Sequence, residues 1–412
     1  MNFLIKNKNY LPIFFFFTIG LFISLKRGSN FSDGDSFDVI LSFLNFIDYG
    51  FYSPSRGAYG HLVPEFIIGF FAYNFGTPIS NLICFLFFFS SIFILAKTFD
   101  LKREKIIFFY ILTLSNFLLL SENTNSIDYP IALFFFSSGI FFLKKDKVLI
   151  TSLFFGLAII SRANFVIFIY PIILIYFAYK NINQKNILNF LSIGFLSTLI
   201  GICFFIPTLY FYEFSIDFIK IPFLTKSETP GWYGGPELSF ASLLPRFVYK
   251  IYLIIGVFSS FIFLFILIFN FKKIFIFKSL DKAIFFYIIF FNILMFFFMP
   301  VKTLLLNPFI IFSYLLLLKS IDNKIISLLI ILNIFQWFFS YDILDIKYKK
   351  QDLCFAKHAI SAQFNLSPAS GSFIKFLKQT DEQSLCYSKF MREYSYQFQN
   401  NLPLKLSNHT IR

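Results

Sequence analysis

Long apolar runs, separated by short polar stretches, recur along most of this 412-residue chain. The first covers 10–25 and the second clear one covers 77–97. A helix that crosses a bilayer needs roughly 20 predominantly apolar residues. The pattern predicts an all-α polytopic membrane protein with about 11 transmembrane helices. The further spans are expected at 106–120, 129–143, 148–161, 164–179, 187–209, 247–270, 283–299, 303–319 and 325–340.

The segment between the first two spans has a different pattern. Over 38–49, apolar residues recur at helical spacing with polar residues on the opposite face. Residues 61–75 are apolar but contain Pro64 and Glu65, and this stretch is short for a crossing. We expect both to be amphipathic helices at the outer membrane surface, within an outer loop over 26–76.

Lysine and arginine residues predict the orientation, because cytoplasmic loops of membrane proteins are enriched in them. Lys6 and Lys8 place the N-terminus in the cytoplasm, and the first apolar run then reads as an uncleaved signal anchor. The C-terminus is expected outside, in the periplasm, and the protein in a bacterial inner membrane. The cations expected on the inner side are Lys97, Lys102, Arg103, Lys105, Lys144, Lys145, Lys147, Lys180, Lys185, Lys272, Lys273, Lys278, Lys282, Lys319 and Lys324.

Composition agrees with this class, since 57% of residues are hydrophobic, 14% are charged and the mean hydropathy is +0.72. The 70 Phe residues accompany abundant Ile, Lys and Asn, which indicates codon bias rather than an aromatic binding surface. The net charge of +14 comes from Lys and Arg residues in the short loops between the expected spans. These loops lack the interleaved basic and aromatic residues that are typical of a nucleic-acid-binding surface.

Three carboxylates, Asp33, Asp35 and Asp38, follow the first span. Charged groups near a bilayer are costly and usually functional. A partly desolvated carboxylate can have a raised pKa that suits a general base. The alternative is a solvated turn, in which Asp33 or Asp35 caps the helix that begins near Ser36.

The last 72 residues differ from the rest, with mixed charge and no long apolar run. We expect a transmembrane domain over 1–340 and a small extracytoplasmic domain over 341–412. If that domain is periplasmic, Cys354 and Cys386 could form a disulfide, and the alternative is two free thiols. No spacing of cysteine and histidine indicates zinc.

The sequence GDSFDVILSFLNFIDYGFYSPSRGAYGHLVPEFIIGFFAYNFG resembles the first outer loop of the GT-C glycosyltransferases. In that family an acidic residue follows span one, and a proline element opens a second helix that ends in Phe-Gly. Here Asp35 matches the acidic residue and 61–64 the proline element. The sequence departs from the pattern at Val39, where Tyr is common, and keeps only one proline, Pro64.

Further matches follow in order over roughly residues 10 to 320. SIDYPIALFF resembles the start of the family's fourth span, with Asp128 at its acidic position. GLAIISRANFVIF and PVKTLLLNPFIIF resemble two later elements, with Arg162 and Lys302 at their basic positions. By plan the chain is most similar to the protein mannosyltransferase and lipid A aminoarabinose transferase branch.

This resemblance implies an inverting hexosyltransferase that uses a polyprenyl-phosphate sugar donor and a lipid, glycan or protein acceptor. Asp35 would be the base, with Asp38 one helical turn away as the second candidate. Arg162 and Lys302 would bind the leaving phosphate. The alternatives are an interfacial anchor for Arg162 and a snorkelling side chain for Lys302.

Other residues are expected to bind substrate. Asp128 could orient Arg162 or bind the acceptor, and His61 belongs to the proline element. Glu65 could bind substrate or favour the dipole at a helix start. Trp232 and Tyr233 could stack on a sugar or lie at the membrane interface. A divalent cation held by Asp33 and Asp35 stays open, since relatives of this family also manage without one.

Two other classes of protein stay open. A transporter or flippase would place polar residues at mid-depth in the spans, whereas here acidic residues collect on one side. A polymerase or ligase of lipid-linked sugars with another fold would gather basic residues in a late loop. The 210–246 loop contains Lys220, Lys226 and Arg246. A non-catalytic anchor for the tail would leave the ordered motifs unexplained.

Overall fold

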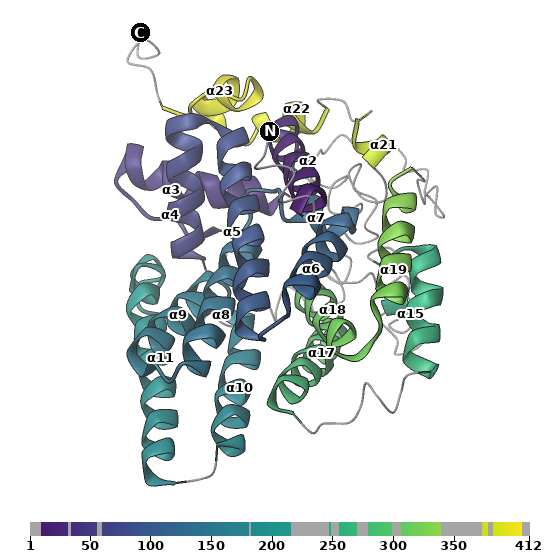
Figure 1. Ribbon diagram of the computed structural model, residues 1–412. Helices are drawn as coiled ribbons and strands as arrows, with labels where there is room; N and C mark the ends of the chain where they lie inside the picture. The colour runs from purple at the N-terminus through teal and green to yellow at the C-terminus, as the bar shows by residue number, and fades with distance from the viewer. Residues whose placement is uncertain are drawn as a thin grey trace, which may run out of the picture.

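Every regular element that the computed structural model describes is a helix, so the all-α prediction is confirmed. Figure 1 shows the order of the elements along the chain. The structure describes residues 10–31, 34–55, 60–180, 183–215, 247–248, 255–269, 279–298, 306–338, 373–377 and 382–405.

The helices match the predicted apolar runs in order. Two shorter helices, α3 and α4, lie between α2 and α5 at the predicted positions. The elements are α2 (Leu11–Arg27), α3 (Asp35–Tyr49), α4 (Leu62–Phe75), α5 (Thr77–Thr98), α6 (Arg103–Ser115), α7 (Phe117–Glu122), α8 (Asp128–Lys144), α9 (Val148–Ser161), η3 (Ala163–Phe165), α10 (Val166–Tyr179), α11 (Gln184–Phe211), α15 (Val257–Phe269), α17 (Leu280–Phe298), α18 (Asn307–Ser320), α19 (Asn323–Gln336), α21 (Phe373–Leu377), α22 (Glu382–Ser388), η6 (Arg392–Tyr394) and α23 (Ser395–Gln399).

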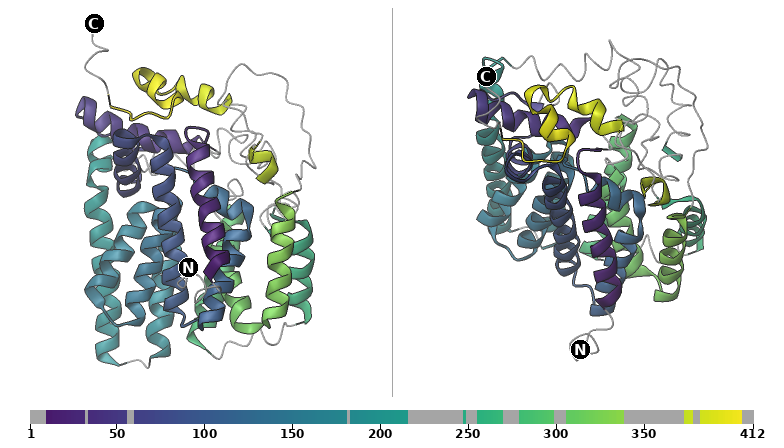
Figure 2. Two further views of the ribbon diagram at one scale, coloured as in Figure 1. Left: turned by 45° about the horizontal axis from the view of Figure 1, so that its top comes forward. Right: turned by 90° about the horizontal axis from the view of Figure 1, so that it is seen from above.

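The long helices run side by side as a bundle, and α3 lies across one end of it (Figure 2, left). Helix α9 packs between α8 and α11, α8 packs on α5, and α17 packs on α18. We name the end that carries α3, α22 and α23 the outer end. The opposite end, where α5, α8 and α18 terminate, is the inner end. The names follow the orientation expected from the lysine distribution.

Two of the described helices, α5 and α11, are long and apolar enough to cross a membrane, against about eleven expected. Helices α9, α18 and α19 have 14 residues each, or about 21 Å, against a hydrocarbon thickness of about 30 Å. The expected span over 106–120 is divided, because Asn116 leaves the helical conformation (ψ 101°). Its side chain instead caps α7 by accepting from the Leu119 amide at 3.0 Å.

The described part of the C-terminal region packs on the outer end and shares the core of the bundle, to which Tyr387 and Phe398 belong. The Oδ1 atom of Asn401 accepts from the Ser29 amide at 2.7 Å and from the Thr77 hydroxyl at 3.1 Å. The tail therefore joins the segment just after α2 to the start of α5, both of which lie more than three hundred residues earlier in the chain. Cys386 is disulfide-bonded, and Cys354 lies outside the described residues.

Candidate functional site

An ion pair between Asp128 and Arg162 is the centre of the candidate site. Asp128 is the first residue of α8, and its side chain is fully buried. Arg162 ends α9 in an extended conformation (φ −161°, ψ 110°), so the chain turns there before α10. Its Nη1 donates to Asp128 Oδ2. The contact places Asp128 where it can orient Arg162, which is one of the two roles that the sequence suggested for Asp128.

The guanidinium of Arg162 has capacity left for a ligand. It lies over the ring of Tyr129, with Cζ 3.5 Å from the ring centroid. The side chain is 12% exposed, and its Nε atom is buried without a hydrogen-bond partner among the described residues. The same holds for Ser161 Oγ and Asn164 Oδ1 on either side of it. Buried polar atoms without partners are rare and call for an explanation, and an unseen ligand is one.

His61 brings a third polar group to the Asp128 carboxylate. It precedes α4, and its Nε2 atom lies 3.9 Å from Asp128 Oδ2. The backbone amide of His61 donates to Glu65 Oε1 at 2.8 Å. The first turn of α4 therefore fixes the position of His61 beside Asp128.

Glu65 organises the loop that joins α3 to α4. Its carboxylate is fully buried and also accepts from the Tyr52 hydroxyl at 2.5 Å and the Ser55 amide at 3.0 Å. Burial raises the pKa of Glu65, although its hydrogen-bond donors lower it. Burial and the neighbouring Glu65 carboxylate raise the pKa of Tyr52 as well. The sequence singled out Glu65 but gave no signal for Tyr52.

Asp35 and Asp38 both lie in the first turn of α3 and are half-buried. The ring of Phe37, between them, stacks on Phe390 with centroids 5.6 Å apart. Helix α3 is about 22 Å long at 1.5 Å per residue. Asp35 therefore lies at one end of α3, and the loop that Glu65 organises leaves from the other end. The role of Asp35 as base stays a prediction.

A second buried cation, Arg27, was missed from the sequence. It ends α2 and is 1% exposed. Its guanidinium donates to Asn125 Oδ1 and, at 3.3 Å, to Ser121 Oγ. All six residues of 121–126 are buried, although each is polar. An unbroken polar run between two apolar helices is the signal that could have revealed this network.

Several expected site residues cannot be placed. No group of three or more His, Cys, Asp or Glu side chains that could hold a metal ion occurs within the described ranges. A metal site that includes Asp33 stays a prediction, because Asp33 lies outside those ranges. The expected residues that lie outside the described ranges are Asp33, Lys302, Trp232 and Tyr233.

The site thus assembles Asp128, Arg162, His61 and Glu65 from α4, α8 and the end of α9. Arginine beside a buried carboxylate can bind a further anion through donors that the carboxylate does not use. No protein-family model, curated protein or solved structure matches this chain. The likeness to GT-C glycosyltransferases therefore rests on the sequence motifs alone.

Proposed function

We propose that this chain is a membrane glycosyltransferase of the GT-C type. It would move a sugar from a polyprenyl-phosphate donor to a lipid, glycan or protein acceptor at the outer face of a bacterial inner membrane. The observation that carries the proposal is the buried Asp128–Arg162 pair, in which the Nε–H of Arg162 has no partner among the described residues.

The exposed apolar surface supports a membrane location. Helix α11 has 28 residues, and most of its apolar length is exposed. Phe195 is 67% exposed and Tyr210 is 74% exposed. Water-soluble monomers rarely expose continuous apolar patches of this extent. We propose that about eleven helices cross the bilayer, some of them shorter than a typical span and tilted or interrupted within the protein.

The grouping of charges supports the proposed orientation. Lys144 of α8 contacts the Thr98 carbonyl at 2.6 Å, and Lys105 of α6 contacts the Ile321 carbonyl at 3.0 Å. Three loops expected in the cytoplasm are therefore neighbours at one end. The buried ion pair lies at the start of α8, which is the opposite end of that helix.

Arginine suits the leaving group of this reaction. As the acceptor oxygen forms a bond to the anomeric carbon, the bond from that carbon to the phosphate oxygen breaks. Its electron pair leaves with the phosphate, where negative charge develops. The free Nε–H of Arg162 would donate to a phosphate oxygen in a dry site, where such bonds are strong. Lys302 would be a second phosphate ligand.

The proton of the acceptor hydroxyl needs a base. Asp35 is the proposed base and Asp38 the second candidate, both half-buried in the first turn of α3. Asp128 is proposed as the residue that positions Arg162, because its carboxylate already accepts from that side chain. His61 and Glu65 would shape the acceptor side, and Trp232 and Tyr233 would stack on the sugar.

The test uses the purified full chain in nanodiscs with polyprenyl-phosphate mannose, polyprenyl-phosphate glucose and a membrane-lipid acceptor extract. Replacing Asp35 with Asn should lower transfer by roughly 10²- to 10⁴-fold while leaving expression intact. Full activity in that variant would remove Asp35 from the mechanism. Movement of the donor across the bilayer without a new glycosidic bond would favour the flippase alternative. Joining of whole lipid-linked glycans would favour the polymerase or ligase alternative.

A further inference from the structure

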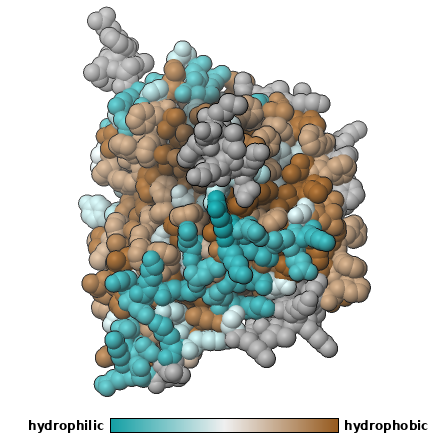
Figure 3. All heavy atoms as spheres, in the orientation of Figure 1, coloured by the Kyte–Doolittle hydropathy of each residue, from teal (hydrophilic) through white to brown (hydrophobic). Residues whose placement is uncertain are grey.

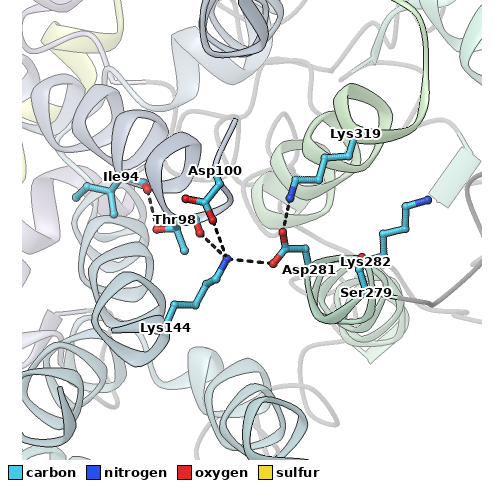
Figure 4. Close-up of polar contacts among 8 residues, drawn as sticks. All are labelled: Ile94, Thr98, Asp100, Lys144, Ser279, Asp281, Lys282 and Lys319. Atoms are coloured by element: carbon cyan, nitrogen blue, oxygen red, sulfur yellow. Dashed lines mark hydrogen bonds and ion pairs between the residues drawn. The ribbon is translucent and has the colours of Figure 1, made fainter. Parts of the chain in front are cut away.

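A cluster of charged side chains joins three helices at the inner end (Figure 4). It lies at the opposite end of α8 from Asp128 of the proposed catalytic site. Asp281, in the first turn of α17, accepts from Lys144 at 3.1 Å and from Lys319. Lys144 ends α8 and Lys319 lies in the last turn of α18. The nearby Asp100 lies 3.8 Å from Lys144 but is 87% exposed, so water screens much of its charge.

Positive charge exceeds negative charge across this end. The described residues there include twelve cations and five carboxylates, an excess of seven positive charges. Figure 3 shows a broad hydrophilic surface on the face that contains this end. The cations are Lys97, Lys102, Arg103, Lys105, Lys144, Lys145, Lys147, Lys180, Lys185, Lys282, Lys319 and Lys324, and the carboxylates are Asp100, Glu104, Asp146, Asp281 and Asp322.

The lysines of the cluster rest on an aromatic ring at the end of the bundle. The ammonium nitrogen of Lys144 lies 5.2 Å from the ring centroid of Phe99, and that of Lys319 lies 6.0 Å from it. Lys145 and Lys180 lie over Phe141 and Tyr176 in the same way. Partly exposed ammonium groups that lie over aromatic rings at the end of a bundle suit the headgroup level of a bilayer, where aromatic and basic side chains are enriched.

We propose that Lys144 and Lys319 form a binding site for the phosphodiester headgroup of an anionic phospholipid in the inner leaflet. Asp281 holds the two ammonium groups side by side and cancels only one of their two charges. Basic sites between helices on the cytoplasmic side bind such headgroups. The inference rests on the proposed membrane location but is independent of the transferase activity.

The test compares two variants with the same change in charge. The full chain is purified in detergent, stripped of lipid and titrated with phosphatidylglycerol, and bound lipid is counted by native mass spectrometry. The double variant Lys144→Gln/Lys319→Gln should bind phosphatidylglycerol roughly tenfold more weakly than the wild type. The control Lys180→Gln/Lys185→Gln, at the connection of α10 and α11, should bind like the wild type.

Several outcomes would overturn the proposal. These are an equal loss in both double variants, equal binding of phosphatidylcholine by the wild type, or displacement of the lipid by millimolar inorganic phosphate. Unchanged phosphatidylglycerol binding, with polyglutamate captured only by the wild type, would assign the pair to an acidic soluble partner. Lys144→Arg/Lys319→Arg should retain lipid binding. The single variant Lys319→Gln provides a milder change should the double variant fail to fold.

Discussion

Two aspartates, Asp128 at the outer end and Asp281 at the inner end, have closely similar partners but different surroundings. Asp128 lies against Arg162 and His61, and Asp281 lies against Lys144 and Lys319. The side chain of Asp128 is 0% exposed, whereas that of Asp281 is 16% exposed and its lysine partners are 20% and 24% exposed.

The difference in burial determines how much free energy each charged pair costs the fold. Water and salt screen the inner cluster, so each of its pairs contributes little to stability. The Asp128 carboxylate has lost its hydration and Arg162 is only 12% exposed, so an apolar pair of the same size would be as stable or more stable there. A buried ion pair with an unpartnered donor is therefore better explained by function than by stability. At the inner end the pairs are partly exposed, so a functional role there is argued from the excess of positive surface charge instead.

The largest expected effect comes from removing one member of the outer pair. Asp128→Asn should lower the free energy of unfolding by about 3–5 kcal/mol, because it leaves Arg162 buried without its counter-charge. The matched variant Asp281→Asn should cost about 1 kcal/mol or less. Denaturant unfolding of both proteins in the same detergent measures the two values. Equal costs would remove the distinction between the two ends.

A second pair of variants probes how tightly the C-terminal tail closes the outer end. Gly76 has φ 86°, and a Cβ there would lie 2.6 Å from the backbone oxygen of Asn401. Gly76→Ala should cost about 2–3 kcal/mol, from a strained backbone and displacement of the tail. Gly50 has φ 71° with open space around it, so Gly50→Ala should cost about 1 kcal/mol from strain alone.

The readout for these two variants is the unfolding midpoint, together with the rate of proteolysis of the tail. Faster cleavage in Gly76→Ala but not in Gly50→Ala is expected. The same cleavage rate in both variants would show that the tail does not depend on this contact.

Glu65 should make the stability of the outer end depend on pH. Burial raises its folded-state pKa above the ordinary value of 4.5. Its protonated form therefore stabilises the fold at low pH, and this stabilisation is lost as pH rises through the raised pKa. Compared with Glu65→Gln, the wild type should lose stability as pH increases above about 4.5. Thermal unfolding of both proteins across pH 4–8 tests the sign, and a wild type that gains stability relative to Glu65→Gln as pH rises would contradict it.

The smallest effect is expected at the exposed inner pair of Lys180 and Asp146, whose side chains are 36% and 49% exposed. Lys180→Gln should change the free energy of unfolding by about 0.5 kcal/mol or less, and 0.5 M salt should abolish the difference. A cost above about 2 kcal/mol would mean that the inner end also depends on specific ion pairs.

The sequence allowed much of this comparison to be predicted. Apolar periodicity located the helices, and lysine spacing separated the two ends. The motif that contains Asp128 suggested that this residue could orient Arg162, although 34 residues separate them. These features could be predicted because they depend on local sequence pattern or on residue types that are rarely buried.

Other features depend on contacts that local pattern does not encode. The helix break at Asn116 was not predicted, because one polar residue barely changes the mean hydropathy of a long apolar segment. The Tyr52–Glu65 contact and the docking of Asn401 on Ser29 join loops that have no periodicity. Burial of Arg27 depends on the 121–126 loop, whose polar residues resemble an ordinary surface connection.

The most direct test of the central claim is binding of undecaprenyl phosphate to the full chain in phosphatidylcholine nanodiscs. The wild type should bind it saturably, and the charge-balanced variant Asp128→Asn/Arg162→Gln should bind it roughly ten- to hundredfold more weakly. Lys144→Gln/Lys319→Gln should bind it as the wild type does. Undiminished binding by a folded Asp128→Asn/Arg162→Gln protein, or loss of binding only in the inner variant, would contradict the account.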